Sequence, residues 1–273
     1  MNYGTGPDIS SWQHDSGQVL DFNAVKAAGH NFVIVKATED SGYVNPYFAQ
    51  DVRDVQAAGL IAWPYHYMGP SSAASQVDAV LAAVGQVLTS GMLWLDYEEH
   101  STHAILHEMK RELDATPFRA GVYTYPDWWA NNGDPTCQAC AAHPLWWADY
   151  NPAHNRPAPA PWSQVTLRQT HGTSYAVPGL SGLNDMSRAE VDLATILIPS
   201  MPPPPPDLED RMLVLVTGDP HLWEIVGSRL EHIDAPSWAA RCVLRKHNGM
   251  APERILRVNP HDPIALLPKV AAA

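Results

Sequence analysis

The chain has 273 residues, of which 45% are hydrophobic and 17% are charged, so it can fold around a substantial core. Its formal net charge of −12 argues against sequence-independent binding to nucleic acid, which requires a basic surface. It contains no apolar run long enough to span a bilayer, so membrane insertion is not expected. The first seven residues have neither the basic start nor the apolar stretch of a secretory signal peptide, and none is expected.

Proline marks the domain organisation of the chain. The 25 prolines include five in succession in the segment Met-Pro-Pro-Pro-Pro-Pro-Asp at 201–207. Consecutive prolines adopt an extended, stiff polyproline helix. The sequence therefore predicts a large domain at 1–200, a polyproline linker at 201–206 and a small module at 207–273.

Strand and helix signals alternate through the large domain. Strands are predicted at 6–10, 31–37, 60–66, 92–96, 119–123, 145–149 and 165–169. Helices are predicted at 45–59, starting at an Asn-Pro pair, and at 72–89 and 102–114. Such alternation is typical of an α/β fold with a parallel sheet and external helices. At about 200 residues, a closed or nearly closed barrel is favoured over an open sheet.

Two acids end one of the predicted strands, in Met-Leu-Trp-Leu-Asp-Tyr-Glu at 92–98. Residues two apart on a strand share a face, so Asp96 and Glu98 both face the barrel interior at its ligand-binding end. Two neighbouring carboxyl groups do not ionise independently, and one pKa is expected to rise. A proton donor beside a carboxylate is what glycoside hydrolysis requires. The alternative is a solvent-facing pair, or a pair that caps the next helix.

Two further acids and a set of aromatic residues support a carbohydrate site. Asp8 follows Gly6-Pro7 in a segment that is either the first strand or a turn. Asp192 is flanked by apolar residues and is either a further acid of the site or a simple edge or cap residue. Flat rings suit the apolar faces of sugars, although any single ring could serve packing alone. The aromatic residues at predicted strand ends are Trp12, Tyr65, Tyr67, Tyr123, Tyr125, Trp128, Trp129, Trp146, Trp147 and Tyr150.

A series of motifs between residues 6 and 194 resembles one family. In order they are GPDISSWQ, FVIVKATE, YVNPYF, AAGLIAWPYHY, LWLDYE, GVYTY, LWWADY, RQT and EVDL. These motifs are similar to the glycoside hydrolase family 25 muramidases, the lysozymes of the Chalaropsis type. The resemblance implies a flattened α/β barrel. It also implies cleavage of the β-1,4 bond between N-acetylmuramic acid and N-acetylglucosamine in bacterial peptidoglycan, without a cofactor or a metal ion.

The resemblance also implies roles for individual residues. Glu98 becomes the general acid/base, Asp96 its partner carboxylate, and Asp8 and Asp192 further acids of the pocket. The expected sugar-contacting residues are Glu39, Tyr65, Tyr123, Trp147, Tyr150 and Gln169. We expect a substrate-assisted route, in which the 2-acetamido group attacks the anomeric carbon while Asp96 orients it, with an inverting route as the alternative. One departure is Arg168 beside Gln169, where an aromatic residue is expected.

Cysteine and histidine give only weak metal signals. Cys137 and Cys140, followed by His143, make half a zinc site without a second matching pair, so a local disulfide or two free thiols is favoured. His103 and His107 are one helical turn apart but lack the glutamate of zinc proteases, so they are interpreted as a solvated helix face.

The small module contains mixed signals. A strand at 212–216, helices at 222–230 and 237–246, and extended pieces at 255–258 and 264–267 predict a small α+β unit. Short matches around Gly218-Asp219, Asn248-Gly249 and Leu266-Leu267-Pro268 weakly resemble the LysM module, which binds glycans containing N-acetylglucosamine. The alternative is an oligomerisation or wall-binding module of another kind.

Together these features predict a modular muramidase whose partner is bacterial peptidoglycan. A wall-directed enzyme without a signal peptide suggests a phage endolysin that accumulates in the host cytoplasm, is released by a holin and then acts at the cell wall. The alternatives are a non-catalytic glycan-binding protein on the same barrel and a tail-associated, wall-penetrating enzyme of a virion.

Overall fold

The computed structural model divides into two units, residues 1–199 and 200–273. In the first unit it describes residues 3–14, 17, 19–84, 87, 92–114, 116, 118–151, 153 and 155–197. In the second it describes the strands at 213–216, 222–226, 229–233, 255–258 and 269–270. The predicted polyproline linker at 201–206 lies outside the described residues.

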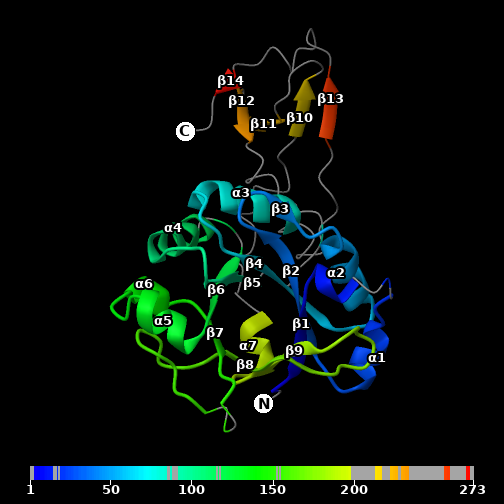
Figure 1. Cartoon of the computed structure of the whole chain (residues 1–273). Coiled ribbons are helices and arrows are strands. Elements are labelled where there is room, and N and C mark those ends of the chain that lie inside the picture. The colour runs from blue at the N-terminus through cyan, green and yellow to red at the C-terminus, as the bar shows by residue number, and fades with distance from the viewer. Residues whose placement is uncertain are drawn as a thin grey trace. The chain divides into compact units, whose positions relative to one another are not determined.

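Eight strands among the described residues of the first unit close into a barrel (Figure 1). Seven run parallel, whereas the last, β9, runs antiparallel to its neighbours β8 and β1. The predicted α/β barrel is therefore confirmed, with β3 (Tyr43–Val44) as an antiparallel addition outside the ring. The strands of the ring are β1 (Thr5–Ile9), β2 (Phe32–Glu39), β4 (Ile61–Tyr67), β5 (Met92–Asp96), β6 (Arg119–Thr124), β7 (Leu145–Ala148), β8 (Leu167–Tyr175) and β9 (Asn184–Ala189).

Most of the helices cover the outside of this ring, and α7 lies in its centre (Figure 1). Side chains fix two of their starts: Asp21 accepts from the backbone N–H groups of Asn23 and Ala24 at α1, and Thr102 accepts from Ile105 at α4. The elements are a 3₁₀ turn η1 (Ser11–His14) and the helices α1 (Phe22–Ala27), α2 (Phe48–Ala57), α3 (Ala73–Val84), α4 (His103–Leu113), α5 (Pro126–Asn132), α6 (Gln138–Ala141) and α7 (Leu193–Leu197).

Two helix boundaries differ from the prediction. Helix α2 begins at Phe48 rather than at Asn45-Pro46, because Asn45 is used elsewhere. Its amide donates to the Lys36 carbonyl and its side-chain oxygen accepts from the Tyr47 N–H, so Asn45 ties a turn to β2. Helix α3 runs over Ala73–Val84, and most of the predicted remainder up to 89 lies outside the described residues.

The interior of the barrel is apolar along most of its length and becomes polar at the carboxyl ends of the parallel strands. Alternate residues of the strands point inward, and Phe32, Ile34, Trp63, Trp94 and Trp146 belong to one buried core cluster. On β5 the residue after Trp94 on the same face is Asp96, so the core gives way to acids at the strand end.

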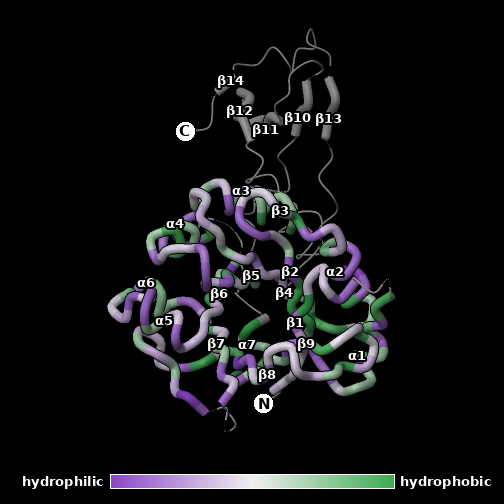
Figure 2. The backbone as a smooth tube through the Cα atoms, in the orientation of Figure 1, coloured by the Kyte–Doolittle hydropathy of each residue, from purple (hydrophilic) through white to green (hydrophobic). Residues whose placement is uncertain are grey.

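Helix α7 also belongs to the barrel core. Its Leu193 and Ile196 are 3% and 1% exposed and join the same core cluster. Figure 2 shows hydrophobic residues along α7 in the centre of the barrel. Because β9 runs antiparallel, α7 follows its far end and fills the side of the barrel opposite the ends of the parallel strands.

The second unit contains a sheet with strand order β13-β10-β11-β12-β14 among the described residues. Its strands are β10 (Leu213–Val216), β11 (Leu222–Val226), β12 (Arg229–Ile233), β13 (Ile255–Val258) and β14 (Lys269–Val270). The helix predicted at 222–230 is wrong, because β11 and β12 form an antiparallel pair. The Gly227-Ser228 dipeptide between them is a hairpin signal that outweighs the helical spacing of the apolar residues.

The other predictions for this unit have mixed outcomes. The strand at 212–216 and the extended piece at 255–258 are confirmed as β10 and β13. The helix predicted at 237–246 and the piece at 264–267 lie outside the described residues, as do most of the residues behind the LysM resemblance. Within the described part of the chain, no helix has the length and apolar character needed to cross a membrane.

Candidate active site

Four carboxyl groups meet where the parallel strands end. Asp96 is the last residue of β5, Glu98 follows it by two residues, and Asp8 lies near the end of β1. Asp185, near the start of β9, pairs directly with Asp8 because β9 is antiparallel and so begins where the others end. Beyond the effect of burial, the carboxyl groups of Asp8, Asp96 and Glu98 raise one another's pKa values, so the three predicted acids lie close together at this end of the barrel.

A buried glutamine connects the acids to two tyrosines. The Gln169 amide nitrogen donates to Asp8 Oδ2 at 2.9 Å and to Asp185 Oδ2 at 3.2 Å. Its oxygen accepts from the hydroxyls of Tyr123 at 2.9 Å and Tyr150 at 2.5 Å. The amide therefore lies between two carboxylates that would otherwise repel each other, and it fixes two rings of the pocket wall.

The environment of the cluster favours protonated acids. Burial, then the charge of Glu99 and of Asp185, raises the pKa of Glu98 to about 7. Burial raises the pKa of Asp96 well above its usual value, and Glu98 adds to the effect. The pKa of Asp8 is also raised well above its usual value, first by burial and then by Asp185. The cluster thus holds protons at neutral pH, with Glu98 poised between its two forms.

Within the described part of the chain, Asp96 has one carboxyl oxygen without a donor, and it shares a nearby cation with Glu98. Among the residues that the structure describes, no hydrogen-bond donor reaches Asp96 Oδ1, although the side chain is only 7% exposed. Lys36 opposes the rise in the pKa of both Asp96 and Glu98. The Lys36 ammonium lies 2.5 Å from Glu39 Oε2 and 4.7 Å from the ring centroid of Tyr67. Glu39 therefore acts on the cluster through Lys36, a residue that the sequence analysis did not single out.

Cavities open on both sides of the acids. One, of about 570 Å³, is lined by Glu98, Tyr123, Tyr125 and Tyr150. The other, of about 580 Å³, is lined by Asp8, Asp185, Tyr65 and Trp12. The Trp12 ring is 76% exposed at the second cavity, as expected of a ring that stacks against a ligand rather than a core. A chain-like ligand that filled both cavities would cross the acidic cluster.

The structure corrects the position of Asp192. This residue lies at the start of α7, where its carboxylate accepts from the Ala194 N–H as a helix cap. It follows the far end of β9, on the side of the barrel opposite the acidic cluster, whereas Asp185 begins that strand beside Asp8. Sequence reasoning missed Asp185 because segment 184–189, Asn-Asp-Met-Ser-Arg-Ala, lacks the apolar alternation of a strand.

Trp147 is likewise placed differently from the prediction. Trp146 belongs to the interior cluster and packs against Tyr123 with ring centroids 4.6 Å apart and against Tyr65 at 6.4 Å. Neighbouring residues of a strand face opposite sides, so Trp147 points out of the barrel and cannot contact a sugar in the pocket. Trp146 packs against the two tyrosines that line the cavities, so Trp146 rather than Trp147 is the tryptophan that supports the site.

Arg168, the departure in the predicted motif, has a structural role on the outside of the barrel. Its side chain is 5% exposed and donates to Asp149 Oδ2, Glu190 Oε1 and the Arg156 carbonyl, each at 2.9 Å. The ion pairs tie the proline-rich loop to β7 and β8. The neighbouring Gln169 still faces the pocket, so the departure leaves the site intact.

The conclusion that Asp185, and not Asp192, belongs to the acidic cluster can be tested with two matched variants. We expect Asp185→Asn to lower kcat by about a hundredfold, because it removes a charge that borders Asp8 and Gln169. Asp192→Asn should leave activity within about twofold, since asparagine caps a helix as well as aspartate does. Steady-state rates on purified bacterial cell walls would measure both, and the reverse pattern would restore Asp192 to the site.

The barrel sequence matches a known protein family. Residues 7–179, which include Asp8, Asp96, Glu98 and Gln169, match the family described as Glycosyl hydrolases family 25. The match covers well over half of the chain. The chain belongs to glycosyl hydrolase family 25. It is therefore a glycoside hydrolase, as its motifs imply.

Relatives of this family 25 chain are similar over about three fifths of its length. "Lysozyme-like protein 5" of Caenorhabditis elegans is 30% identical over 176 residues, which are 59% of this chain and 82% of the relative. The N,O-diacetylmuramidase of Chalaropsis sp. is 28% identical over 195 residues, 64% of this chain and 90% of the relative.

Solved structures share the fold. The lysozyme of Streptomyces coelicolor has a TM-score of 0.61 at 23% identity and covers 71% of this chain and 95% of its own. The CTP1L endolysin has a TM-score of 0.61 at 19% identity and covers 99% of this chain and 94% of its own.

Proposed function

We propose that this family 25 hydrolase is a muramidase, which cleaves the β-1,4 bond between N-acetylmuramic acid and N-acetylglucosamine in peptidoglycan. The observation that carries the proposal is the pair of buried Asp96 and half-buried Glu98 beside two open cavities, with the pKa of Glu98 raised to about 7. The family relatives support the substrate, since the Chalaropsis protein is an N,O-diacetylmuramidase.

In the proposed reaction, Glu98 donates its proton to the glycosidic oxygen as the bond breaks. A pKa of about 7 leaves a large fraction of Glu98 protonated at neutral pH, as a general acid requires. The conjugate base is stabilised by Lys36, which favours its charged form. After the leaving group departs, the same carboxylate can accept a proton from the attacking water.

Asp96 is proposed to hold the 2-acetamido group of the substrate. Asp96 ends β5 two residues before Glu98, and a carboxyl oxygen at this position can accept a hydrogen bond from a substrate N–H. Oriented in this way, the acetamido oxygen attacks the anomeric carbon, and the product retains its configuration. The alternative is inversion by a water activated by a second acid, such as Asp185.

The two routes can be separated by NMR of the first product. A product with the β configuration, formed before mutarotation, is expected from the substrate-assisted route. An α product would establish inversion. A covalent glycosyl adduct on Asp96, detected by mass spectrometry of trapped enzyme, would replace the substrate-assisted route with a direct nucleophilic one.

Trp12 is expected to contribute binding rather than chemistry. Replacing this exposed ring by alanine should raise KM for long glycan strands by about five- to tenfold and change kcat by less than about twofold. Trp12→Phe keeps an aromatic face and should recover most of the affinity. An equal loss in kcat, or no recovery in the phenylalanine variant, would exclude a stacking role.

The substrate is tested by comparing polymers. The enzyme should release soluble fragments from purified peptidoglycan and act far more slowly on oligomers of N-acetylglucosamine alone. Equal rates on both would show that muramic acid is not recognised, and the proposal would narrow to a hydrolase of N-acetylglucosamine polymers.

We further propose that the protein is a phage endolysin that accumulates in the host cytoplasm and reaches the wall after release by a holin. The two-unit organisation, and the match of the CTP1L endolysin across both units, favour this role. Expression in a susceptible host should cause lysis only when a holin or a permeabilising agent is added. Recovery of the protein from purified virions would instead support the tail-associated alternative.

The second unit is proposed to bind the cell wall. A second binding site would raise the effective concentration of the barrel at its polymeric substrate. Inactive full-length Glu98→Gln protein should co-sediment with purified walls, and free N-acetylglucosamine oligomers should compete if the LysM resemblance reflects function.

A further inference from the structure

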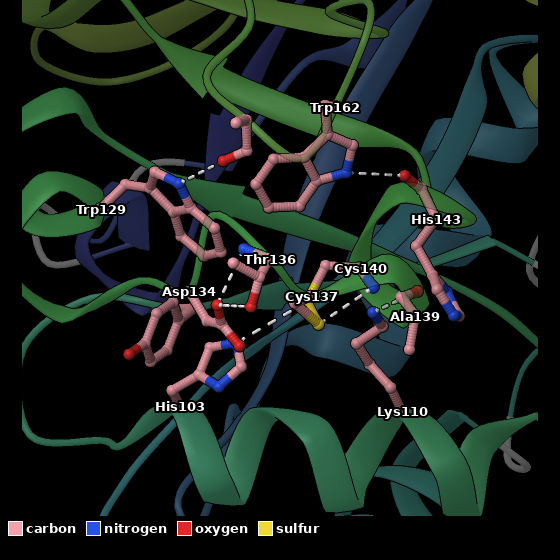
Figure 3. Close-up of a disulfide and its surroundings, with 12 residues drawn as sticks. His103, Lys110, Trp129, Asp134, Thr136, Cys137, Ala139, Cys140, His143 and Trp162 are labelled. Atoms are coloured by element: carbon pink, nitrogen blue, oxygen red, sulfur yellow. Dashed lines mark hydrogen bonds between the residues drawn. A yellow bond between two sulfur atoms is a disulfide. The ribbon is translucent and has the colours of Figure 1, made fainter.

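Two cysteines and a histidine lie together between α4 and α6, away from the acidic cluster (Figure 3). Cys137 and Cys140 form a disulfide, one of the two states that the sequence left open. His103 Nε2 lies 3.7 Å from Cys140 Sγ, and the three possible ligand atoms all lie within 4.8 Å of one another. His103 is thus not a member of a solvated face, unlike the exposed His107.

These distances suit a tetrahedral metal site. Zinc binds thiolate sulfur at about 2.3 Å and imidazole nitrogen at about 2.0 Å, which puts neighbouring ligand atoms about 3.5–3.8 Å apart. The separation between His103 Nε2 and Cys140 Sγ falls within that range. The two residues between the cysteines give a spacing that recurs in zinc sites.

Neighbouring residues hold the His103 ring and favour negative charge on the two cysteine sulfurs once they are reduced. The His103 ring stands edge-on to Tyr97 and Trp129, with centroids 6.4 Å and 6.1 Å away. The Cys140 N–H donates to Cys137 Sγ at 3.1 Å, an interaction that stabilises charge on that sulfur. Lys110 Nζ donates to the Ala139 carbonyl at 2.8 Å, so a buried ammonium lies beside the cysteine loop and favours thiolates.

We propose that His103, Cys137 and Cys140 form a redox-gated site for Zn²⁺. In the oxidised protein the sulfurs are bonded to each other and the site is closed to the ion. A dithiol reductant supplies two electrons and two protons, so the S–S bond breaks, two thiols form and the reductant becomes a disulfide. Zn²⁺ then binds both thiolates and the neutral imidazole, the two thiol protons pass to solvent, and water completes the coordination.

The metal would connect parts of the chain that the disulfide does not. The disulfide closes a loop within 137–140, whereas a bound ion would join that loop to the first residue of α4, 37 residues away in sequence. Between them lies α5, whose first residues Pro126 and Asp127 line the cavity beside Glu98. Zinc is therefore expected to stabilise the reduced barrel and this wall of the groove.

The test uses full-length protein carrying Cys242→Ser, so that the remaining cysteine outside the cluster cannot contribute a thiol. Zinc sulfate is added to the protein oxidised or reduced with a phosphine under nitrogen, and bound metal is measured by mass spectrometry after gel filtration. Co²⁺ then serves as a spectroscopic probe, because thiolate ligands give charge-transfer bands and a tetrahedral site gives intense visible bands. The comparison variants are Cys137→Ser with Cys140→Ser, His103→Ala and, as the matched control, His107→Ala.

We expect reduced protein to bind one ion per chain and oxidised protein to bind none. His103→Ala should weaken binding by about tenfold or more and alter the cobalt spectrum, whereas His107→Ala should match the parent. Zinc should raise the melting temperature of the reduced parent only. If the reduced parent binds no zinc, or if His103→Ala retains the parent affinity and spectrum, the proposal is wrong. Circular dichroism of the reduced parent, compared with that of the oxidised parent, shows that the fold is kept when zinc binding is measured.

Discussion

Replacing Glu98 by glutamine is expected to lower kcat on peptidoglycan by about a thousandfold, because general acid catalysis contributes about 10²–10⁴ to such rates. Glutamine occupies nearly the same volume but cannot release a proton to the glycosidic oxygen. The fold and the affinity for the wall should be kept. Glu108→Gln, an exposed change on α4, is the matched control and should have the parent rate.

The pH profile tests the same role without removing the acid. With a pKa of about 7, Glu98 loses its proton as the pH rises, so kcat/KM should fall above about pH 7. Glu99 raises that pKa, so Glu99→Gln should move the alkaline limb to lower pH. A profile that stays flat through neutral pH, or a Glu98→Gln enzyme with nearly parent activity, would exclude Glu98 as the acid.

The Asp96→Asn variant is expected to lose activity and gain stability. Activity should fall by about a hundredfold or more, because the amide cannot ionise and so cannot stabilise the positive charge that develops on the 2-acetamido group in the transition state. Burial and Glu98 raise the pKa of Asp96 in the folded chain. The unfolded chain therefore ionises first, and this residue costs stability as the pH rises above about 4. The amide has no such cost, so the gain in melting temperature should be larger at about pH 8 than at about pH 4.

The control for this second prediction is an exposed aspartate. Asp78 lies on the outer side of α3, and Asp78→Asn should show neither the loss of activity nor the pH-dependent gain in stability. Thermal unfolding followed by circular dichroism across that pH range measures the effect. A destabilised Asp96→Asn protein at alkaline pH would mean that the carboxylate is held by favourable contacts rather than tolerated for function.

Local patterns were sufficient to predict much of the barrel and part of its site. Alternation along 92–98 places Asp96 and Glu98 on the inner face of one strand, which needs no knowledge of neighbouring strands. The strand-then-helix order likewise predicts a parallel sheet, because parallel strands need long crossover connections.

The errors arose where position depends on distant parts of the chain. Asp185 enters the cluster only because β9 reverses direction and pairs with β1, and its polar segment gives no local sign of a strand. The choice of Trp147 over Trp146 was an error of one residue in register, which reverses every side chain of a strand. The role of Lys36 could not be predicted locally, because it depends on the path of β2 in the barrel and on the acids that other strands bring near its ammonium group.

The central claim is that the acidic cluster makes this protein a muramidase with Glu98 as its proton donor. Its most direct test is mass spectrometry of reduced fragments after digestion of purified peptidoglycan by the parent and by Glu98→Gln. The parent should produce new reducing ends on N-acetylmuramic acid, and the variant should produce none. New ends on N-acetylglucosamine, or equal cleavage by the two proteins, would contradict it.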